Sequence, residues 1–526
     1  MNESGVGSRG GSGAEVSIPH LRKKGSATQL IVEGKPFLIL GGELHNSSSS
    51  SLAYMRPIWQ RIKDLNFNTV LAPVSWELIE PEEGRFDFTL VDGLIHEARR
   101  RELRLVFLWF GSWKNGMSSY VPLWVKRDTN RFPRVRLQDN KTVEVLSTFS
   151  ETNARADAAA FAALMRHIRA VDGDSHTVIM VQVENEVGIL KDSRDRSEAA
   201  NEAFAAAVPD ALLTYLNNNR AELVPELRER WDAAGARTVG TWEEMFGRGP
   251  ETDEIFMAWN YARYIDSVAA AGKEGYALPL FVNAWLNTQS KHGEWPTGGP
   301  LPHTMDIWLA GAPHLDLLTP DIYHPDFAKW CALYTRRGNP LFIPEMHHQA
   351  NGARNVFYAI GHHDAIGTSP FAFDAITDPL EAPLGKSYEA LSSLSPLILE
   401  HQGLNRMIGV LLDAENPSVT HELGGYKLTI SLDAIFDYKA EIGYGLIIAT
   451  GPDSFVGAGS GFQVSFQPID PAQGKVGIGS VDEGEYRQGK WIAGRRLNGD
   501  ENDQGNHWRF NNKKIHTLRC RVYSYS

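Results

Sequence analysis

Short apolar runs alternate with amphipathic stretches along the first three quarters of the chain. The runs lie at residues 38–40, 69–74, 103–110, 177–181, 278–282, 315–319, 341–344 and 367–373, and each ends in polar residues. Apolar runs of this length are typical of strands buried on both faces of a parallel sheet. Eight such units over about 370 residues, with helical spacing between most of them, predict a (β/α)8 TIM barrel.

Helical periodicity indicates helices over residues 55–65, 90–102, 156–171, 252–273 and 388–401, and a long helical region over 192–230. A doubly wound open sheet is the competing α/β architecture, and it would normally bind a nucleotide through a glycine-rich first turn. The first predicted strand leads into Gly41-Gly42-Glu43, which lacks that glycine spacing. The pattern therefore favours the barrel.

The pattern changes near Leu404. Residues 404–526 contain short β-like runs punctuated by Gly and Asp, which predicts a smaller all-β, sandwich-like domain. Residues 1–27 are rich in Gly and Ser and charged, and we expect a disordered extension there. The predicted organisation is an extension over 1–27, a catalytic barrel over 28–403 and an all-β domain over 404–526. The role of the last domain, as a polysaccharide binder, a barrel cover or an oligomer contact, stays open.

Carboxylates follow two of the predicted barrel strands. Residues 182–188 (Gln-Val-Glu-Asn-Glu-Val-Gly) follow the fourth strand, and Glu345 follows the seventh, 159 residues after Glu186. Loops after barrel strands carry the chemistry in this fold. Two carboxyl groups about 5–5.5 Å apart suit retaining hydrolysis of a glycosidic bond. We expect Glu186 to be the acid/base, with a pKa raised by burial and by the nearby nucleophile, and Glu345 to be the nucleophile.

Other strand ends supply candidate substrate contacts. Asn185 is expected to donate to the sugar 2-hydroxyl, and Tyr323 to hold Glu345 as a carboxylate. Glu184 alternates with Glu186 and is expected to point away into a structural salt bridge. The remaining candidates are aromatic platforms or hydrogen-bonding groups, with core packing as the alternative for each tryptophan: Glu43, His45, Trp76, Glu77, Trp113, Asn115, Trp285 and His347.

Motifs for other chemistries are incomplete. The histidines show no His-x-x-x-His or Cys/His ligand spacing, so no metal site is predicted. Gly385-Lys386-Ser387 lacks the earlier glycine of a phosphate loop, and no Gly-x-Ser-x-Gly elbow occurs. We therefore expect no cofactor.

Composition narrows the range of binding partners that we expect. The 526 residues contain 52 basic and 64 acidic side chains, a net charge of -12 with no basic stripe, which argues against nucleic acid and anionic membranes. No apolar run has the length of a membrane span. The 14 Trp and 16 Tyr fit an oligosaccharide substrate, because sugar faces stack on aromatic rings. A homo-oligomer is left open.

Cysteine content and the N-terminus bear on the compartment. Only Cys331 and Cys520 occur, which excludes a disulfide framework and leaves a single bridge undecided. The first 27 residues lack the apolar segment of a secretory signal. The chain as given predicts a cytoplasmic location, and a processed N-terminus would instead fit a periplasmic or secreted protein.

Three segments resemble glycoside hydrolase family 35, the β-galactosidases. Residues 182–188 look like its acid/base signature, Gly42-Glu43-Leu44-His45 like its first-strand motif, and Trp76 to Phe88 like its Trp…Glu-Pro…Gly…Phe segment. The resemblance covers roughly residues 28–400. It implies a barrel, retention of configuration, Glu186 as acid/base and Glu345 as nucleophile.

The chain departs from the common family pattern at Asn46, at Glu77-Leu78-Ile79 and at Gly111-Ser112-Trp113. It looks more like a divergent branch with a short β-rich C-terminal domain, in which some members resemble enzymes acting on galactosylated xyloglucan fragments. The expected function is a retaining exo-β-galactosidase that releases terminal β-D-galactose from oligosaccharides. The alternatives are another β-glycosidase, such as a β-glucosidase or β-mannosidase, and a non-catalytic carbohydrate-binding protein.

Overall fold

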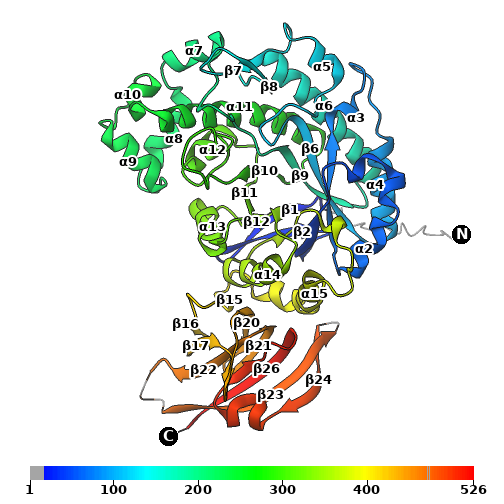
Figure 1. Cartoon of the computed structure of the whole chain (residues 1–526), viewed down its shortest axis with the longest axis vertical. Coiled ribbons are helices and arrows are strands. Elements are labelled where there is room, and N and C mark those ends of the chain that lie inside the picture. The colour runs from blue at the N-terminus through cyan, green and yellow to red at the C-terminus, as the bar shows by residue number, and fades with distance from the viewer. Residues whose placement is uncertain (1–16, 471, 473, 488, 526) are drawn as a thin grey trace, which may run out of the picture.

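A closed barrel of parallel strands forms the larger part of the molecule (Figure 1). The computed structural model describes residues 17–470, 472, 474–487 and 489–525. Within them the barrel strands are β4 (Ile39–Glu43), β5 (Thr69–Ser75), β6 (Arg104–Lys114), β9 (Val178–Asn185), β10 (Leu280–Trp285), β11 (Leu317–Ile322), β12 (Phe342–Ile343) with β13 (Glu345–Met346), and β14 (Gly367–Thr368). Each lies on one of the runs that predict the fold, so the predicted TIM barrel is confirmed.

The seventh barrel strand is divided at Pro344. β12 pairs with β14 and β13 pairs with β11, so the two short pieces together close the ring. Proline has no N–H to donate to a strand ladder, which accounts for the break. The register of β13 places Glu345 directly beside Asp321 of β11. Paired residues of parallel strands face the same side of the sheet, so both side chains point into the barrel mouth.

An antiparallel sheet packs against the interior of the barrel. It comprises β1 (His20–Lys24), β2 (Ala27–Val32) and β3 (Lys35–Phe37). Leu30 and Val32 pack with barrel residues such as Val106, Phe281 and Phe342. The expected disordered extension over 1–27 is therefore wrong from His20 onward, because β1 pairs residue by residue with the buried β2. Residues 1–16 of that extension lie outside the described residues.

Helices surround the strands. They are α1 (Leu52–Met55), α2 (Ile58–Asp64), α3 (Trp76–Ile79), α4 (Thr89–Arg100), α5 (Leu123–Arg127), α6 (Glu151–Asp172), α11 (Pro250–Gly275), α12 (Met305–Gly311), α13 (Phe327–Tyr334), α14 (Ala350–His363) and α15 (Pro383–His401). A small hairpin of β7 (Arg134–Arg136) and β8 (Thr142–Leu146) lies in the loop after β6.

The predicted long helical region over 192–230 is in fact divided. It holds α7 (Glu198–Ala205), α8 (Asp210–Asn218) and the start of α9 (Pro225–Ala233), and α10 (Trp242–Phe246) follows. Pro209 precedes α8 and Pro225 is the first residue of α9. Proline interrupts the hydrogen bonds of a continuing helix but suits its first turn, so both prolines start new helices here.

Two antiparallel sheets make up the described residues from Met407 onward (Figure 1). The larger contains β15 (Met407–Leu412), β20 (Gly443–Gly451), β21 (Ser454–Ser460), β26 (His516–Tyr525), β23 (Lys475–Arg487) and β24 (Lys490–Leu497). The smaller contains β16 (Ser418–Leu423), β17 (Tyr426–Leu432), β22 (Phe462–Pro468) and β25 (Trp508–Phe510), and a short pair, β18 (Ala434–Ile435) and β19 (Tyr438–Lys439), stands apart. Their shared core includes Leu428, Ile447, Phe462 and Trp508, as expected for a sandwich.

Strand β20 is buried on both faces. Leu446 and Ile448 belong to the barrel's core cluster, whereas Ile447 and Ala449 belong to the core of the sandwich. Strand side chains alternate between the two faces of a sheet, so one strand can serve both cores. The sandwich packs on the outer helices of the barrel through contacts of α14 with β15 and β20 and of α15 with β23.

Among the described residues, every helix is too short or too polar to span a bilayer.

Candidate active site

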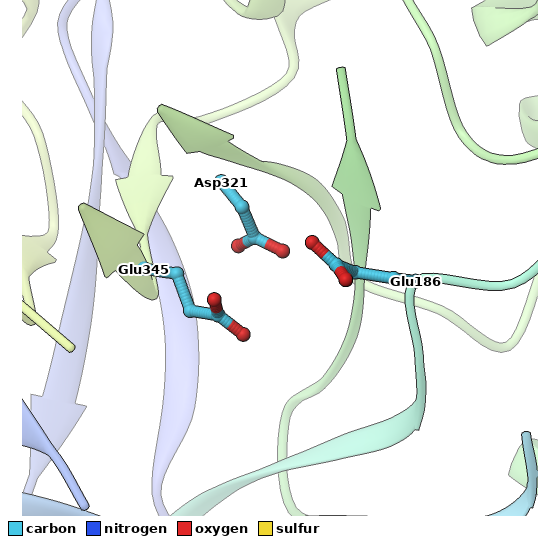
Figure 2. Close-up of side chains that lie close together, drawn as sticks. All are labelled: Glu186, Asp321 and Glu345. Atoms are coloured by element: carbon cyan, nitrogen blue, oxygen red, sulfur yellow. The ribbon is translucent and has the colours of Figure 1, made fainter. Parts of the chain in front are cut away.

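Carboxyl groups converge at the carboxyl ends of the barrel strands. Figure 2 shows the side chains of Glu186, Asp321 and Glu345 pointing toward one another. One carboxyl oxygen from each lies within 4.8 Å of the others. Glu186 and Glu345 therefore converge as the sequence predicts, although the chain separates them by 159 residues. Both line a cavity of about 420 Å³ together with Asn115, Trp285 and Tyr323.

Glu186 lies just after β9 in a left-handed backbone conformation, with φ of 46°. Its backbone N–H donates to Asn283 Oδ1 at 3.0 Å, and Asn115 Nδ2 donates to its Oε2. Burial and the charge of Glu345 raise the pKa of Glu186 to about 7, against the opposing effect of Lys114. A carboxyl group with this pKa can both give and take a proton near neutral pH, which is what an acid/base residue requires.

Glu345 begins β13 and is 5% exposed. The Tyr323 hydroxyl donates to its Oε2 at 3.0 Å, and Asn185 Nδ2 donates to its Oε1 at 3.4 Å. Burial and the neighbouring Glu345 keep the pKa of Tyr323 far above its usual value, so the phenol remains a hydrogen-bond donor. Lys114 Nζ lies 3.9 Å from Glu345 Oε1. The two hydrogen bonds fix the position of the carboxyl group and the Lys114 ammonium lies beside it, an arrangement that suits a nucleophile.

Two buried ionisable groups of the site are missing from the sequence prediction. Lys114 ends β6 at 5% exposure, and Asp321 lies near the end of β11 at 3%. Burial alone would lower the pKa of Lys114, but Glu345, Glu186 and Glu43 outweigh it and raise that pKa. The signal in the sequence that could have identified Lys114 and Asp321 is their position, because both residues follow apolar runs that predict strands. A lone Lys or Asp at a strand end gives no hint of its charge partners.

Glu43 is buried inside the site and does not lie at its surface. It ends β4, is fully buried, and neither carboxyl oxygen has a hydrogen-bond donor within the described part of the chain. Burial, then the charge of Glu345, raises its pKa well above the ordinary range. The structure therefore places Glu43 beside the two predicted catalytic residues, in surroundings that favour its protonated form over its ionised form.

The three tryptophans predicted as sugar platforms have different surroundings. Trp285 is half-buried and lines the cavity with both glutamates. Trp76 and Trp113 are completely buried. The indole of Trp76 donates to Glu80 Oε2 at 2.8 Å, and that of Trp113 donates to the Leu146 carbonyl at 3.1 Å. For these two the platform prediction is wrong, because neighbouring side chains cover both ring faces of a buried indole and leave no room for a sugar.

The other predicted contacts are spread around the mouth. His347 is exposed and packs edge-to-face on Tyr323, with ring centroids 5.0 Å apart. His45 pairs with Asp374 at 3.3 Å, and Glu77 pairs with Lys126 at 3.4 Å. Glu77 lines a separate cavity of about 230 Å³ that does not include Glu186 or Glu345 among its described residues. His45 and Glu77 thus have other charge partners, and neither is among the described residues that line the cavity of the carboxyl pair.

Two further expectations concern groups away from the cavity. Glu184 points away from Glu186 as expected, but it accepts the backbone N–H groups of Ser112 at 3.1 Å and Trp113 at 2.7 Å rather than forming a salt bridge. This arrangement ties β9 to the end of β6. The sequence leaves open whether Cys331 and Cys520 form a disulfide bridge. In the described structure both cysteines are free and buried.

Two family models match parts of this chain. Residues 29–241 match the model of the family described as "Glycosyl hydrolases family 35", and residues 384–509 match a "Domain of unknown function (DUF5597)". The first match contains Glu186 but ends before Glu345. The placement of Glu345 in the site therefore rests on the geometry above.

Of two curated relatives, one is named a β-galactosidase and the other a β-galactosidase-like protein. "Beta-galactosidase" of Xanthomonas manihotis is 29% identical over 172 residues, 31% of this chain and 26% of that protein. "Beta-galactosidase-1-like protein 3" of Homo sapiens is 30% identical over 168 residues, 30% of this chain and 23% of that protein. These matches therefore span about a quarter of each relative's length.

Among solved structures, the β-galactosidase of the psychrophilic Marinomonas ef1 aligns over 68% of this chain and 60% of its own, at 13% identity and a TM-score of 0.47. The family match itself covers β4, β5, β6 and β9 of the barrel, together with the acid/base signature. The part of this chain that forms these four strands is similar to glycosyl hydrolases family 35.

Proposed function

We propose that the chain is a retaining exo-β-galactosidase that removes terminal β-D-galactose from oligosaccharides. The observation that carries the proposal is the spacing of Glu186 and Glu345, whose nearest described carboxyl oxygens lie within 4.8 Å. Retaining enzymes hold the two groups about 5–5.5 Å apart, whereas inverting enzymes leave about 6.5–9.5 Å for a water molecule. The names of the two curated relatives support galactose as the sugar.

In the first step a Glu345 carboxylate oxygen attacks the anomeric carbon. The bond from that carbon to the leaving oxygen breaks, and Glu186 gives its proton to the departing oxygen. The product is a glycosyl ester on Glu345 and a free alcohol. Tyr323 and Asn185, which donate to Glu345 before the step, hold the attacking oxygen in place. Asn185 Oδ1 has no donor among the described residues, so the amide can also meet a sugar hydroxyl.

In the second step the ionised Glu186 takes a proton from water while the water oxygen attacks the anomeric carbon. The ester bond to Glu345 breaks, and the sugar leaves with its original configuration. The same group thus acts as acid and then as base, which the pKa of about 7 for Glu186 allows. In this scheme Trp285, which is half-buried and lines the same cavity as both glutamates, stacks on the sugar ring.

Azide rescue tests the two roles separately. The variant Glu345→Gly should lose turnover of nitrophenyl β-galactoside, and azide should restore it with α-galactosyl azide as product, because azide then attacks from the vacated face. The variant Glu186→Ala should yield β-galactosyl azide through the glycosyl-enzyme. Glu184→Gln, a change at the glutamate two residues away that faces Ser112, is the matched control and should give neither azide. Ordinary hydrolysis by Glu345→Gly would refute the proposal.

Substrate choice needs its own measurement. A panel of nitrophenyl β-galactoside, β-glucoside and β-mannoside, followed by galactosylated xyloglucan oligosaccharides, ranks the sugars by kcat/KM. The proposal expects galactosides to lead, with galactose as the released sugar. A higher kcat/KM for β-glucoside or β-mannoside would be consistent with the proposed double displacement, but glucose or mannose would then take the place of galactose as the preferred sugar. Saturable sugar binding without hydrolysis of any of these compounds would indicate a binding protein instead.

A further inference from the structure

Asp321 occupies a fixed position between the two predicted catalytic glutamates (Figure 2). Asn283 sets the orientation of the Asp321 carboxyl group. The backbone N–H of Glu186 donates to Asn283 Oδ1 at 3.0 Å, which fixes the amide of Asn283. Asn283 Nδ2 therefore donates to Asp321 Oδ2, at 2.6 Å. Asp321 Oδ2 is thus an acceptor. The other oxygen, Oδ1, is buried and has no donor within the described residues. The hydrogen-bonding pattern leaves Oδ1 as the atom that can carry a proton.

The surrounding charges favour a protonated Asp321. The titratable groups that face it are Glu186, Glu345, Glu43, Lys114, Tyr323 and Tyr334. Burial, then the charges of Glu345 and Glu186, raises the pKa of Asp321 well above its ordinary range. One carboxyl oxygen of Asp321 lies within 4.8 Å of an oxygen of Glu186 and an oxygen of Glu345, and at this separation a proton on one of the groups relieves the repulsion among three negative charges.

We propose that Asp321 is a positioning residue that holds a proton at neutral pH and donates it in a hydrogen bond from Oδ1 to the Glu186 carboxylate. The inference rests on the proposed function, because it concerns the acid/base of that reaction. The donated bond stabilises ionised Glu186 after it has protonated the leaving group, and it aims the free Glu186 oxygen at the incoming water. Asp321 itself forms no bond to the sugar in this scheme.

The test compares an amide with a truncation. Asp321→Asn keeps an acceptor oxygen for Asn283 and presents an N–H₂ donor to Glu186, so it reproduces a protonated aspartic acid. Asp321→Ala removes the donor. In profiles of kcat/KM against pH on nitrophenyl β-galactoside, the alkaline limb of Asp321→Asn should stay at the wild-type pH. The limb of Asp321→Ala should move up by about one pH unit, because Glu186 loses a bond to its ionised form.

A charged Asp321 predicts the opposite shift. Removing a negative neighbour would lower the pKa of Glu186, so the alkaline limbs of both variants would move to lower pH. That result would overturn the inference, and so would identical profiles for all three proteins. Asp316→Asn is the matched control: Asp316 lies just before the start of β11, where it pairs with Lys273 at 2.8 Å, and its variant should leave the limb in place.

An infrared difference spectrum tests the proton without requiring turnover. At neutral pH the wild type minus Asp321→Asn spectrum should contain the carbonyl band of a protonated carboxyl group, and the Asp316→Asn difference should lack it. Absence of that band in the Asp321 difference would overturn the inference even in an active enzyme. If the wild type hydrolyses no glycoside of the panel, the proposed function fails, while the band still decides the state of Asp321.

Discussion

At the scale of single residues, the state of Glu186 sets the dependence of activity on pH. Burial first, then the charge of Glu345, raises the pKa of this carboxyl to about 7. The first step needs protonated Glu186, so we expect kcat/KM to be retained below pH 7 and to fall tenfold per unit above it. A pH profile on nitrophenyl β-galactoside measures the limb. A limb near the ordinary carboxyl pKa would contradict the buried environment that the structure gives Glu186.

Lys114 is the second residue with a measurable effect. Its ammonium group is buried among Glu43, Glu186 and Glu345, and it lowers the pKa of Glu43 and Glu186. In Lys114→Met we expect the alkaline limb to move to higher pH and the free energy of unfolding to fall by about 3–5 kcal/mol, the usual loss when a buried charge loses its partner. Urea denaturation measures the second effect. Lys273→Met, at the surface, should change neither, and equal effects of both variants would contradict the role assigned to Lys114.

The sequence predicts only part of this site. Glu186 and Glu345 are predictable because each follows an apolar run and the barrel fold brings strand ends together. Asp321 and Lys114 are not, because their roles depend on lateral neighbours that lie far away in the chain. Trp76 and Trp113 show the reverse case: they follow strands, but the backbone turns each ring into the core.

At the scale of elements, helix α14 and strand β15 meet through glycines. A Cβ atom on Gly409 would lie 2.6 Å from the Tyr358 carbonyl oxygen and 2.9 Å from the His362 backbone nitrogen, both fixed backbone atoms of α14. We expect Gly409→Ala to reduce the free energy of unfolding by about 1–3 kcal/mol through overpacking. Thermal unfolding measures the change. Gly451→Ala is the control, since the nearest atom to its Cβ would be 3.7 Å away. A Gly409 variant as stable as this control would contradict the close contact.

Apolar runs predict the strands better than periodicity predicts the helices. The eight runs all become barrel strands because a strand buried on both faces needs a continuous apolar stretch. The region over 192–230 has helical composition throughout, yet Pro209 and Pro225 divide it. Pro344 likewise splits the seventh strand. The density of apolar residues is a property of the whole segment, whereas its ends depend on single prolines.

At the scale of the whole molecule, the barrel and the sandwich share a core. Strand β20 gives Leu446 and Ile448 to the barrel side and Ile447 and Ala449 to the sandwich. The large sheet shields the apolar side of α14 that carries Phe357, a fully buried residue whose ring centroid lies 5.8 Å from that of Tyr444 in β20. Surface of this kind costs free energy when it meets water. Without the sandwich, this apolar surface of the described barrel would be exposed to water.

This shared core predicts cooperative unfolding. We expect the wild type to show a single calorimetric transition, because losing either part exposes the apolar face of the other. Leu446→Asp places an unpaired charge in the joint core and should cost about 4 kcal/mol or more. It should also separate the unfolding of the two parts into distinct transitions. Lys427→Glu, on an exposed position of β17, should leave the single transition unchanged. Two well-separated transitions in the wild type would mean that the barrel and the sandwich are each stable alone and that β20 does not couple them.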